Sequence, residues 1–406
     1  MFFRFICKVK YFFANIFVNF AQKGSRHIIR PELITFFVSL HETTKLYHYM
    51  KQRLVYFDIL KGMAIFMVVM GHVLTMCVRE IDRAALFKFL GEIHMPLFFF
   101  ISGWFTMRVA DDGHIARPGL SKRFFQLLVP MVAMSSLWVW YFPHSGLQSP
   151  LNSTFQGLWL DEWKDGYWFT LTLLEIVLIY TLIVPLLNRC RRLWSSSVLI
   201  LAVWAVLLIL CEILPADILG ISSFRLTARF FPVFAAGALA ARYKDGFRRL
   251  CAKGSTVTVA LNAGALLLYF ICWPWEFKSM TEGAFGNLTV TVARSAFQIL
   301  LAILAISLVR TWGDTVFTRS WQYMGRKSLA IYLMHYFLLF PMGICRETLI
   351  SMGLGFTPLF VFSAVCAACI IAVTLMMEYV ISKSPLLSAL LIGNMPAKKK
   401  TSPAVA

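Results

Sequence analysis

Long apolar segments alternate with short polar connectors along most of the chain. About 20 apolar residues in a helix span the hydrocarbon core of a bilayer, so each such segment is a potential membrane crossing. The segments lie at residues 57–78, 93–107, 124–142, 167–187, 196–214, 224–241, 256–273, 288–309, 327–345 and 356–381. The pattern therefore predicts an all-α fold, a polytopic membrane bundle of about ten transmembrane helices.

The connectors are too short for a separate soluble domain, so one membrane domain is expected over residues 50–390. A basic tail follows at residues 391–406. The first 49 residues form an N-terminal extension with two interpretations. They suit an amphipathic helix on the membrane surface, or a stretch that precedes a natural start at Met50.

Charge alternates along the chain in a way that predicts its orientation. The net charge of +19 would suggest nucleic acid as the partner of a soluble protein, but 59% of the residues are hydrophobic. Lys and Arg gather in every second connector, including residues 108–123, 242–253 and 310–326. Such connectors are held in the cytoplasm. We therefore expect a multi-pass protein of the cytoplasmic (inner) membrane, with both termini cytoplasmic and no nucleic-acid partner.

The first apolar segment contains three residues that are costly in hydrocarbon, namely Asp58, Lys61 and His72. Asp58 and Lys61 are three residues apart and so adjacent on one helix face. His72 lies eleven residues beyond Lys61, about 16 Å along the same stripe. Such a stripe favours a face toward the bundle interior or a wet cavity. The alternative is a boundary Asp–Lys pair together with a His that bonds to a neighbouring helix.

Other polar residues lie in or beside later segments. Glu92 is expected in the external connector, with Pro96 in the first helical turn and His94 near the outer end, at the depth of His72. His335 is expected about 15 Å into its span, near mid-membrane. Trp168 and Glu175 are seven residues apart and share a helix face. Each His also suits ordinary helix packing, and Trp168 suits a membrane-interface anchor.

The cysteines give no sign of a specialised site. The nine Cys are scattered, mostly within the apolar segments; Cys366 and Cys369 form a single Cys-x-x-Cys pair inside the last segment, and the rest show neither a second ligand pair nor a disulfide framework. The sequence also lacks a glycine-rich phosphate loop and the common hydrolase motifs. We therefore expect neither a metal site nor disulfides.

Several motifs occur in a characteristic order between Tyr56 and about Ser382. They are Asp58-x-x-Lys61-x10-His72, Met95–Gly103, Lys122–Pro130, Tyr167–Phe169 and Ser328–His335. Together they resemble the membrane acyltransferase-3 family, and the first two are the most specific. Some branches of that family carry Arg where this chain has Lys61. Arg at that position can make a bidentate contact, whereas Lys61 of this chain would contact its partner as a single point charge.

The resemblance implies an integral-membrane O-acyltransferase. Members of the family move an acyl group, usually acetyl, from cytoplasmic acyl-CoA to a hydroxyl of an extracytoplasmic glycan or a related acceptor. It implies acyl-CoA, here acetyl-CoA, as the donor substrate, O-acetylation of a cell-envelope polysaccharide as the outcome, and no metal. The membrane bilayer, acyl-CoA and the glycan acceptor are the expected partners.

Roles for individual residues follow from that implied function. Basic residues at the cytoplasmic side would bind the phosphates of CoA. These are Lys61, Arg108, Lys122 and Arg123. His72 would act as general base, His94 would orient it or stabilise the oxyanion, and Asp58 would position Lys61. The residues expected to bind the acceptor are Trp168, Glu175 and His335. Direct transfer and a route through acylated His72 are both open.

A glycan exporter or transporter is the competing interpretation, because the same polar stripe could line a transport pathway. Transporters of that kind commonly place Gly/Pro-broken helices at equivalent positions in two inverted halves. The apolar segments of this chain show no such pair. The sequence therefore favours the enzyme over the transporter.

Overall fold

A computed structural model describes residues 55–77, 85–110, 113–145, 155–252, 260, 263–264, 288–339 and 356–394. Within these ranges the chain is helical, and its β-structure is an isolated bridge between Val109 and Ile115. Eight helices of the described part are long and apolar enough to cross a membrane. The chain is therefore an all-α, multi-pass membrane protein, as the alternation of apolar and polar segments predicts.

The helices named below have the following bounds. They are α3 (Val55–Cys77), α4 (Ala85–Thr106), α5 (Leu120–Ser145), α6 (Phe155–Leu160), η2 (Lys164–Gly166), α7 (Trp168–Arg189), α8 (Leu193–Ile213), α9 (Ala216–Ser222), α10 (Phe224–Arg242), α11 (Lys244–Leu250), α13 (Leu288–Val309), α14 (Val316–Arg326), α15 (Ser328–Met334), η5 (His335–Leu338), α17 (Phe356–Ile381) and α18 (Pro385–Ile392). The membrane-length helices are α3, α4, α5, α7, α8, α10, α13 and α17.

Two predicted spans differ from the structure and two predictions fall outside it. The second span begins at Ala85, so the expected start at residue 93 is wrong and Pro96 lies inside the helix. In the ninth predicted span, the described residues form the short pair α15 and η5. The span predicted at 256–273 lies almost entirely outside the described residues, and so does the extension at residues 1–49.

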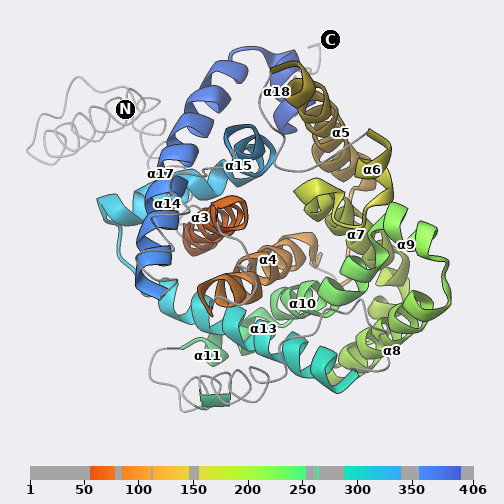
Figure 1. Cartoon of the computed structure of the whole chain (residues 1–406). Helices are drawn as coiled ribbons and strands as arrows, with labels where there is room; N and C mark the ends of the chain where they lie inside the picture. Colours follow the sequence, from red (N-terminus) through yellow and green to blue (C-terminus); the bar gives the residue numbers. More distant parts are fainter. Residues whose placement is uncertain are drawn as a thin grey trace, which may run out of the picture. The chain divides into compact units, whose positions relative to one another are not determined.

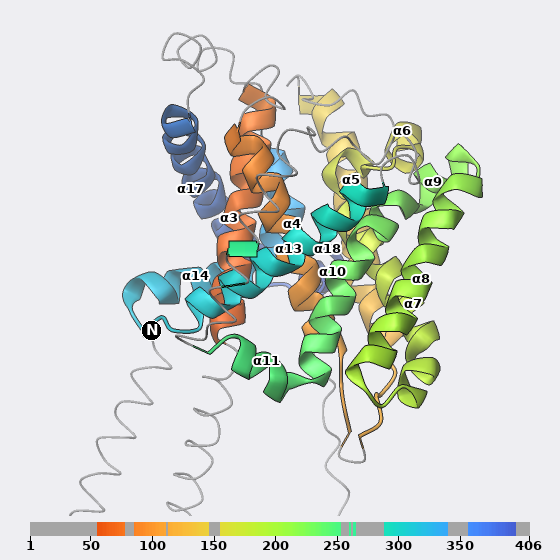
Figure 2. The ribbon, with the colours of Figure 1, turned by 90° about the horizontal axis from the view of Figure 1, so that it is seen from below.

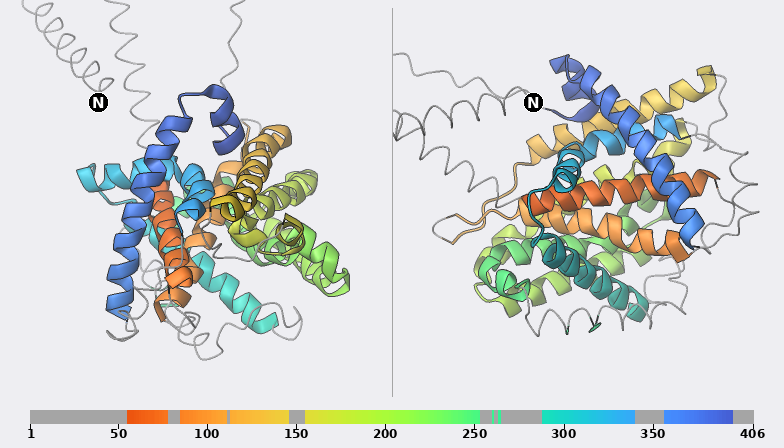
Figure 3. Two further views of the ribbon diagram at one scale, coloured as in Figure 1. Left: turned by 45° about the horizontal axis from the view of Figure 1, so that its top comes forward. Right: turned by 90° about the vertical axis from the view of Figure 1, so that its left-hand side faces the viewer.

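Close packing of α4 against α10 forms the centre of the bundle. A Cβ added at Gly103 of α4 would overlap the carbonyl of Phe234, and one added at Gly237 of α10 would overlap the carbonyl of Phe100. Backbones approach this closely only where the contacting residues lack side chains. Figures 1 and 3 show α3 beside α4, and Phe57 of α3 contacts the ring of Trp104 at 5.2 Å between centroids.

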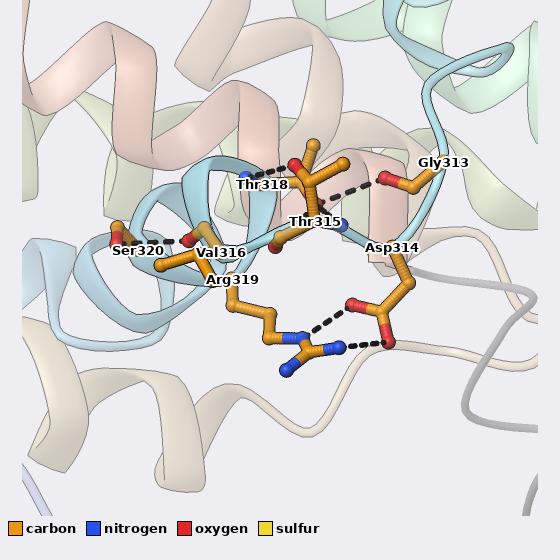
Figure 4. A network of polar contacts seen from close by, with 7 residues as sticks. All are labelled: Gly313, Asp314, Thr315, Val316, Thr318, Arg319 and Ser320. Atoms are coloured by element: carbon orange, nitrogen blue, oxygen red, sulfur yellow. Dashed lines mark hydrogen bonds and ion pairs between the residues drawn. The ribbon is translucent and has the colours of Figure 1, made fainter.

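The amphipathic helix α14 crosses the start of α3 at a second glycine contact. A Cβ at Gly325 would overlap the carbonyl of Asp58. Thr315 caps the first turn of α14 in a reciprocal capping box with Thr318, and Arg319 makes a bidentate ion pair with Asp314 at 2.8 and 3.1 Å (Figure 4). The cap fixes where α14 begins. The glycine contact holds it against the segment that contains Asp58.

The outer spans differ from the central ones in their exposed surface. The most hydrophobic windows of α5, α8 and α17 are only 33% buried, whereas that of α3 is 67% buried. Large apolar side chains are exposed on α8 and α17, among them Leu193, Ile213, Met376 and Val380. An apolar surface of this kind suits contact with lipid chains.

The ends of α10 allow a direct test of orientation. Figure 2 shows α11 and α14, which belong to the basic connectors, toward one end of the spans, and α6 and α9 toward the other. Because Lys and Arg are retained in the cytoplasm, a reporter fused after Gly246 should be cytoplasmic and one fused after Asp217 external. Paired phosphatase and fluorescent-protein fusions measure this. The opposite result would show that the predicted orientation in the membrane is wrong.

Candidate functional site

Three polar rings from α3 and η5 meet inside the bundle, and we call them the histidine–tyrosine cluster. The hydroxyl of Tyr336 lies 2.8 Å from Nε2 of His72. The ring centroids of His72 and His335 are 5.2 Å apart, and those of His335 and Tyr336 are 4.2 Å apart. The structure thus brings together two of the predicted histidines. It adds Tyr336, which no sequence pattern singled out beyond its position next to His335.

The hydrogen bonds of His335 define its tautomer. Its Nδ1 lies 3.0 Å from the carbonyl oxygen of Ile331 and 2.7 Å from that of Tyr332. Carbonyl oxygens only accept, so Nδ1 carries the proton and Nε2 holds a lone pair. This Nε2 is buried and has no hydrogen-bond partner among the described residues. A buried acceptor in this state indicates a place for a donor from a ligand or water.

The connection between η2 and α7 supports the cluster from the other side. Tyr167 donates a hydrogen bond to the carbonyl of Leu333 at 3.0 Å, and Tyr332 donates one to the carbonyl of Gly166 at 2.7 Å. Gly166 has a φ of 95°, and the hydroxyl of Tyr336 occupies the space where its Cβ would lie. Gly166 therefore leaves the room that Tyr336 needs to reach His72.

Lys164 fastens the same connection with a buried ammonium group. Its Nζ donates to the carbonyls of Trp159, Asp161 and Gly220 at 2.8, 2.6 and 2.6 Å. Burial lowers the pKa of Lys164, and the nearby carboxylates of Asp161, Glu175 and Glu162 oppose that shift. Three carbonyl acceptors satisfy the ammonium fully. The segment that holds Gly166 and Tyr167 is thereby tied to α6 and α9.

His94 lies well inside α4, so its expected position near the helix end is wrong. Its Nδ1 donates a hydrogen bond to the carbonyl of Leu90, one turn earlier, which leaves Nε2 with a lone pair. His94 lies two residues after Glu92 on α4, and Glu92 belongs to a second group of charges.

Three of the predicted donor-binding residues, Lys61, Arg108 and Arg123, lie near the last turn of α4. Lys61 forms an ion pair with Asp58 at 2.6 Å, as their spacing predicts, and its Nζ lies 5.9 Å from the ring centroid of Phe105. Arg123 of α5 donates to the hydroxyl of Thr106 at 3.3 Å. Arg108, just after α4, and Lys122 are exposed, and Arg108 repels Arg123 electrostatically. These basic groups belong to the basic end of the spans.

Trp168 and Glu175 share one face of α7, as predicted, and this face packs on α10. The indole of Trp168 stacks on the ring of Phe230, with centroids 5.5 Å apart and planes at 16°. Glu175 accepts a hydrogen bond from Thr227 at 2.5 Å. Both interactions join α7 to α10. The structure does not bring these two residues into the histidine–tyrosine cluster.

A buried charge cluster between α4, α10 and α13 was missed from the sequence. Glu92 accepts hydrogen bonds from Arg294, through Nε at 2.9 Å and through a second guanidinium nitrogen, and from Gln298 at 2.6 Å. Arg229 lies 3.9 Å from the same carboxylate. Glu92 is 4% exposed, so its expected place in an external connector is wrong. Arg229 and Arg294 inside apolar segments were the available signal, because such charges need partners.

No group of three or more His, Cys, Asp or Glu residues gathers as metal ligands in the part of the chain that the structure describes. Cys190, Cys211, Cys251, Cys366 and Cys369 are free thiols.

The sequence of the chain is similar to that of known proteins. A family model described as an acyltransferase domain matches residues 54–377. The nodulation protein NolL of Sinorhizobium fredii (strain NBRC 101917 / NGR234) is 26% identical over 304 residues, which cover 68% of this chain and 75% of that protein. No solved structure matches the chain.

Replacing Gly166 with Ala tests how the connection supports Tyr336. The new Cβ would meet the Tyr336 hydroxyl, and the left-handed backbone is strained for alanine. We expect the free energy of unfolding in detergent to fall by about 1–3 kcal/mol. The matched control is Gly246→Ala in α11, where a Cβ meets nothing within 4 Å. Equal stability of the two variants would contradict this account of Gly166.

Proposed function

We propose that this chain, which belongs to the acyltransferase-3 family, transfers an acyl group from cytoplasmic acyl-CoA to a hydroxyl of an extracytoplasmic glycan or related acceptor. The acyl group that we propose is acetyl. Family membership makes it an acyltransferase, which removes the support for the exporter interpretation. We propose the donor, the acceptor and the acyl group. We also propose that the protein lies in the cytoplasmic membrane.

The hydrogen bond between His72 and Tyr336 is the observation that supports this function best. The Tyr336 oxygen lies 2.8 Å from Nε2 of His72, which is the heavy-atom distance at which a general base takes a proton from a hydroxyl. His72 also lies five residues before the end of α3 that charge predicts to be external. An acceptor hydroxyl that arrives from outside would meet His72 before the basic end of the helix.

In the proposed reaction His72 removes the proton of the acceptor hydroxyl. The oxygen then attacks the thioester carbonyl, a new ester bond forms, and the bond between carbon and sulfur breaks. The leaving thiolate of CoA takes the proton from His72, so that the products are the ester and free CoA. His94 orients His72 or stabilises the oxyanion. Nε2 of His335 accepts a hydrogen bond from the glycan substrate.

The basic group around the last turn of α4 supports donor binding at the opposite end. Arg108 and Arg123 repel each other, and an anionic phosphate between them would relieve that repulsion. Lys61 is held by Asp58 about 16 Å along α3 from His72, a distance that the flexible arm of CoA would span. Lys122 is exposed and free to approach the nucleotide from α5.

Replacing His72 with Gln tests the proposed base. The change adds no charge to the span, so insertion and folding should persist, while transfer from labelled acetyl-CoA to membrane glycan should fall by roughly hundredfold. The control is His114→Gln, which changes an exposed histidine of the connector between α4 and α5. Near-native transfer by the His72 variant would show that another group is the base.

A further inference from the structure

The charge cluster between α4, α10 and α13 holds more positive charge than its carboxylate can satisfy. The cluster has two guanidinium groups and one carboxylate, and Glu92 already accepts from Arg294 at Oε1 and from Gln298 at Oε2, the latter at 2.6 Å. The nearest guanidinium nitrogen of Arg229 is 3.9 Å from Oε1, beyond hydrogen-bond distance. Its Nε is buried and has no hydrogen-bond partner among the described residues. Arg229 is therefore the unsatisfied member of the cluster.

Neighbouring groups do not supply the missing partner. Among the described residues, Glu162 is the next carboxylate near Arg229; its Oε2 forms an ion pair with Arg225 at 3.6 Å, and its Oε1 is buried without a hydrogen bond to Arg229 or to any other group. On its other side the guanidinium of Arg229 lies over the ring of Phe230, 5.1 Å from the centroid, and Phe230 stacks on Phe99. An arginine does not lose its proton to escape such a place. An anion from outside the described chain would complete the site.

The position of the cluster indicates from which side such an anion would come. Glu92, Arg229 and Arg294 are the eighth, sixth and seventh residues of their helices. They therefore share a depth of about 10 Å below helix ends that charge predicts to be external. The side chain of Arg229 keeps 16% of its surface exposed, so it is not fully enclosed by the helices around it. His94 lies two residues after Glu92 on α4, so a residue assigned to the acceptor side and a residue of the cluster lie within one turn of the same helix.

We propose that Arg229 binds an anionic group, a carboxylate or a phosphate, on the acceptor saccharide. The planar guanidinium matches both groups, and the Glu92–Arg294 pair holds the surrounding helices in place. The inference rests on the proposed function, because it assigns the anion to the molecule that His72 deprotonates. Acidic or phosphorylated saccharides, and not neutral ones, are then the acceptors of this enzyme.

The test measures sugar binding by the purified full chain in an uncharged detergent. Calorimetry with D-glucuronate and D-glucose 6-phosphate should detect binding that D-glucose does not show, and Arg229→Gln should weaken it by at least about tenfold. Equal binding of D-glucose, or unchanged binding by Arg229→Gln, would overturn the proposal. Inorganic phosphate that binds as tightly as both sugars would also overturn it, because the site would then not recognise a saccharide.

Matched variants separate a specific site from general charge or misfolding. Arg319→Gln removes one guanidinium from the exposed pair with Asp314 and should leave glucuronate binding unchanged. Arg229→Lys keeps the charge but loses the planar fork, so it should bind glucuronate more weakly than the wild type does. This variant takes the place of Arg229→Gln if that variant fails to fold. Wild-type affinity of Arg229→Lys together with full binding of D-glucose would count against the site.

Release of CoA from acetyl-CoA, measured on the same preparations, tests the proposed function separately. Wild-type protein that binds glucuronate through Arg229 but releases no CoA would overturn acyl transfer and leave the anionic-sugar site standing. Release of CoA that glucuronate does not accelerate, with no detectable binding of glucuronate, would overturn the anion site and leave acyl transfer standing.

Discussion

The hydrocarbon core of a membrane does not solvate charge, so every polar side chain within it needs a partner or a use. Most charged residues inside the bundle have a partner. Asp58 pairs with Lys61, Glu92 with Arg294, and Glu378 with Lys327 at 2.6 Å. Among the described residues, the buried side-chain atoms without a hydrogen-bond partner include Nε2 of His335, Nε of Arg229, Oε1 of Glu162, Oγ1 of Thr172 and Nε1 of Trp321. Of these, Nε2 of His335 and Nε of Arg229 belong to the residues that we propose to contact the acceptor substrate.

Helix α4 connects the groups to which we assign functions. Its last turn contacts Lys61 and Arg123 through Phe105 and Thr106, and Glu92 and His94 lie in its first half. The glycine contact with α10 fixes the distance between α4 and the helix that contains Arg229. Proposed donor and acceptor sites at opposite ends of one rigid helix would keep the substrates apart until they meet near His72.

The sequence predicted interactions within a helix better than those between helices. The pair of Asp58 and Lys61 and the shared face of Trp168 and Glu175 follow from helical spacing alone, and the structure has both. The predicted start of α4 was wrong because Glu92, taken alone, is incompatible with a membrane helix. The partner of Glu92, Arg294, lies about 200 residues away in the sequence. Tyr336 was missed for the same reason, since only the folded chain brings it to His72.

The most direct test is an experimental structure of the chain with a non-hydrolysable thioether analogue of acetyl-CoA. We predict that the nucleotide phosphates lie against Lys61, Arg108, Lys122 and Arg123, with the sulfur atom beside His72. That result would place one end of the donor near Lys61 and the other near His72, two residues of the polar stripe on α3. A nucleotide bound at the opposite end of the spans, or a sulfur atom far from His72, would contradict the account.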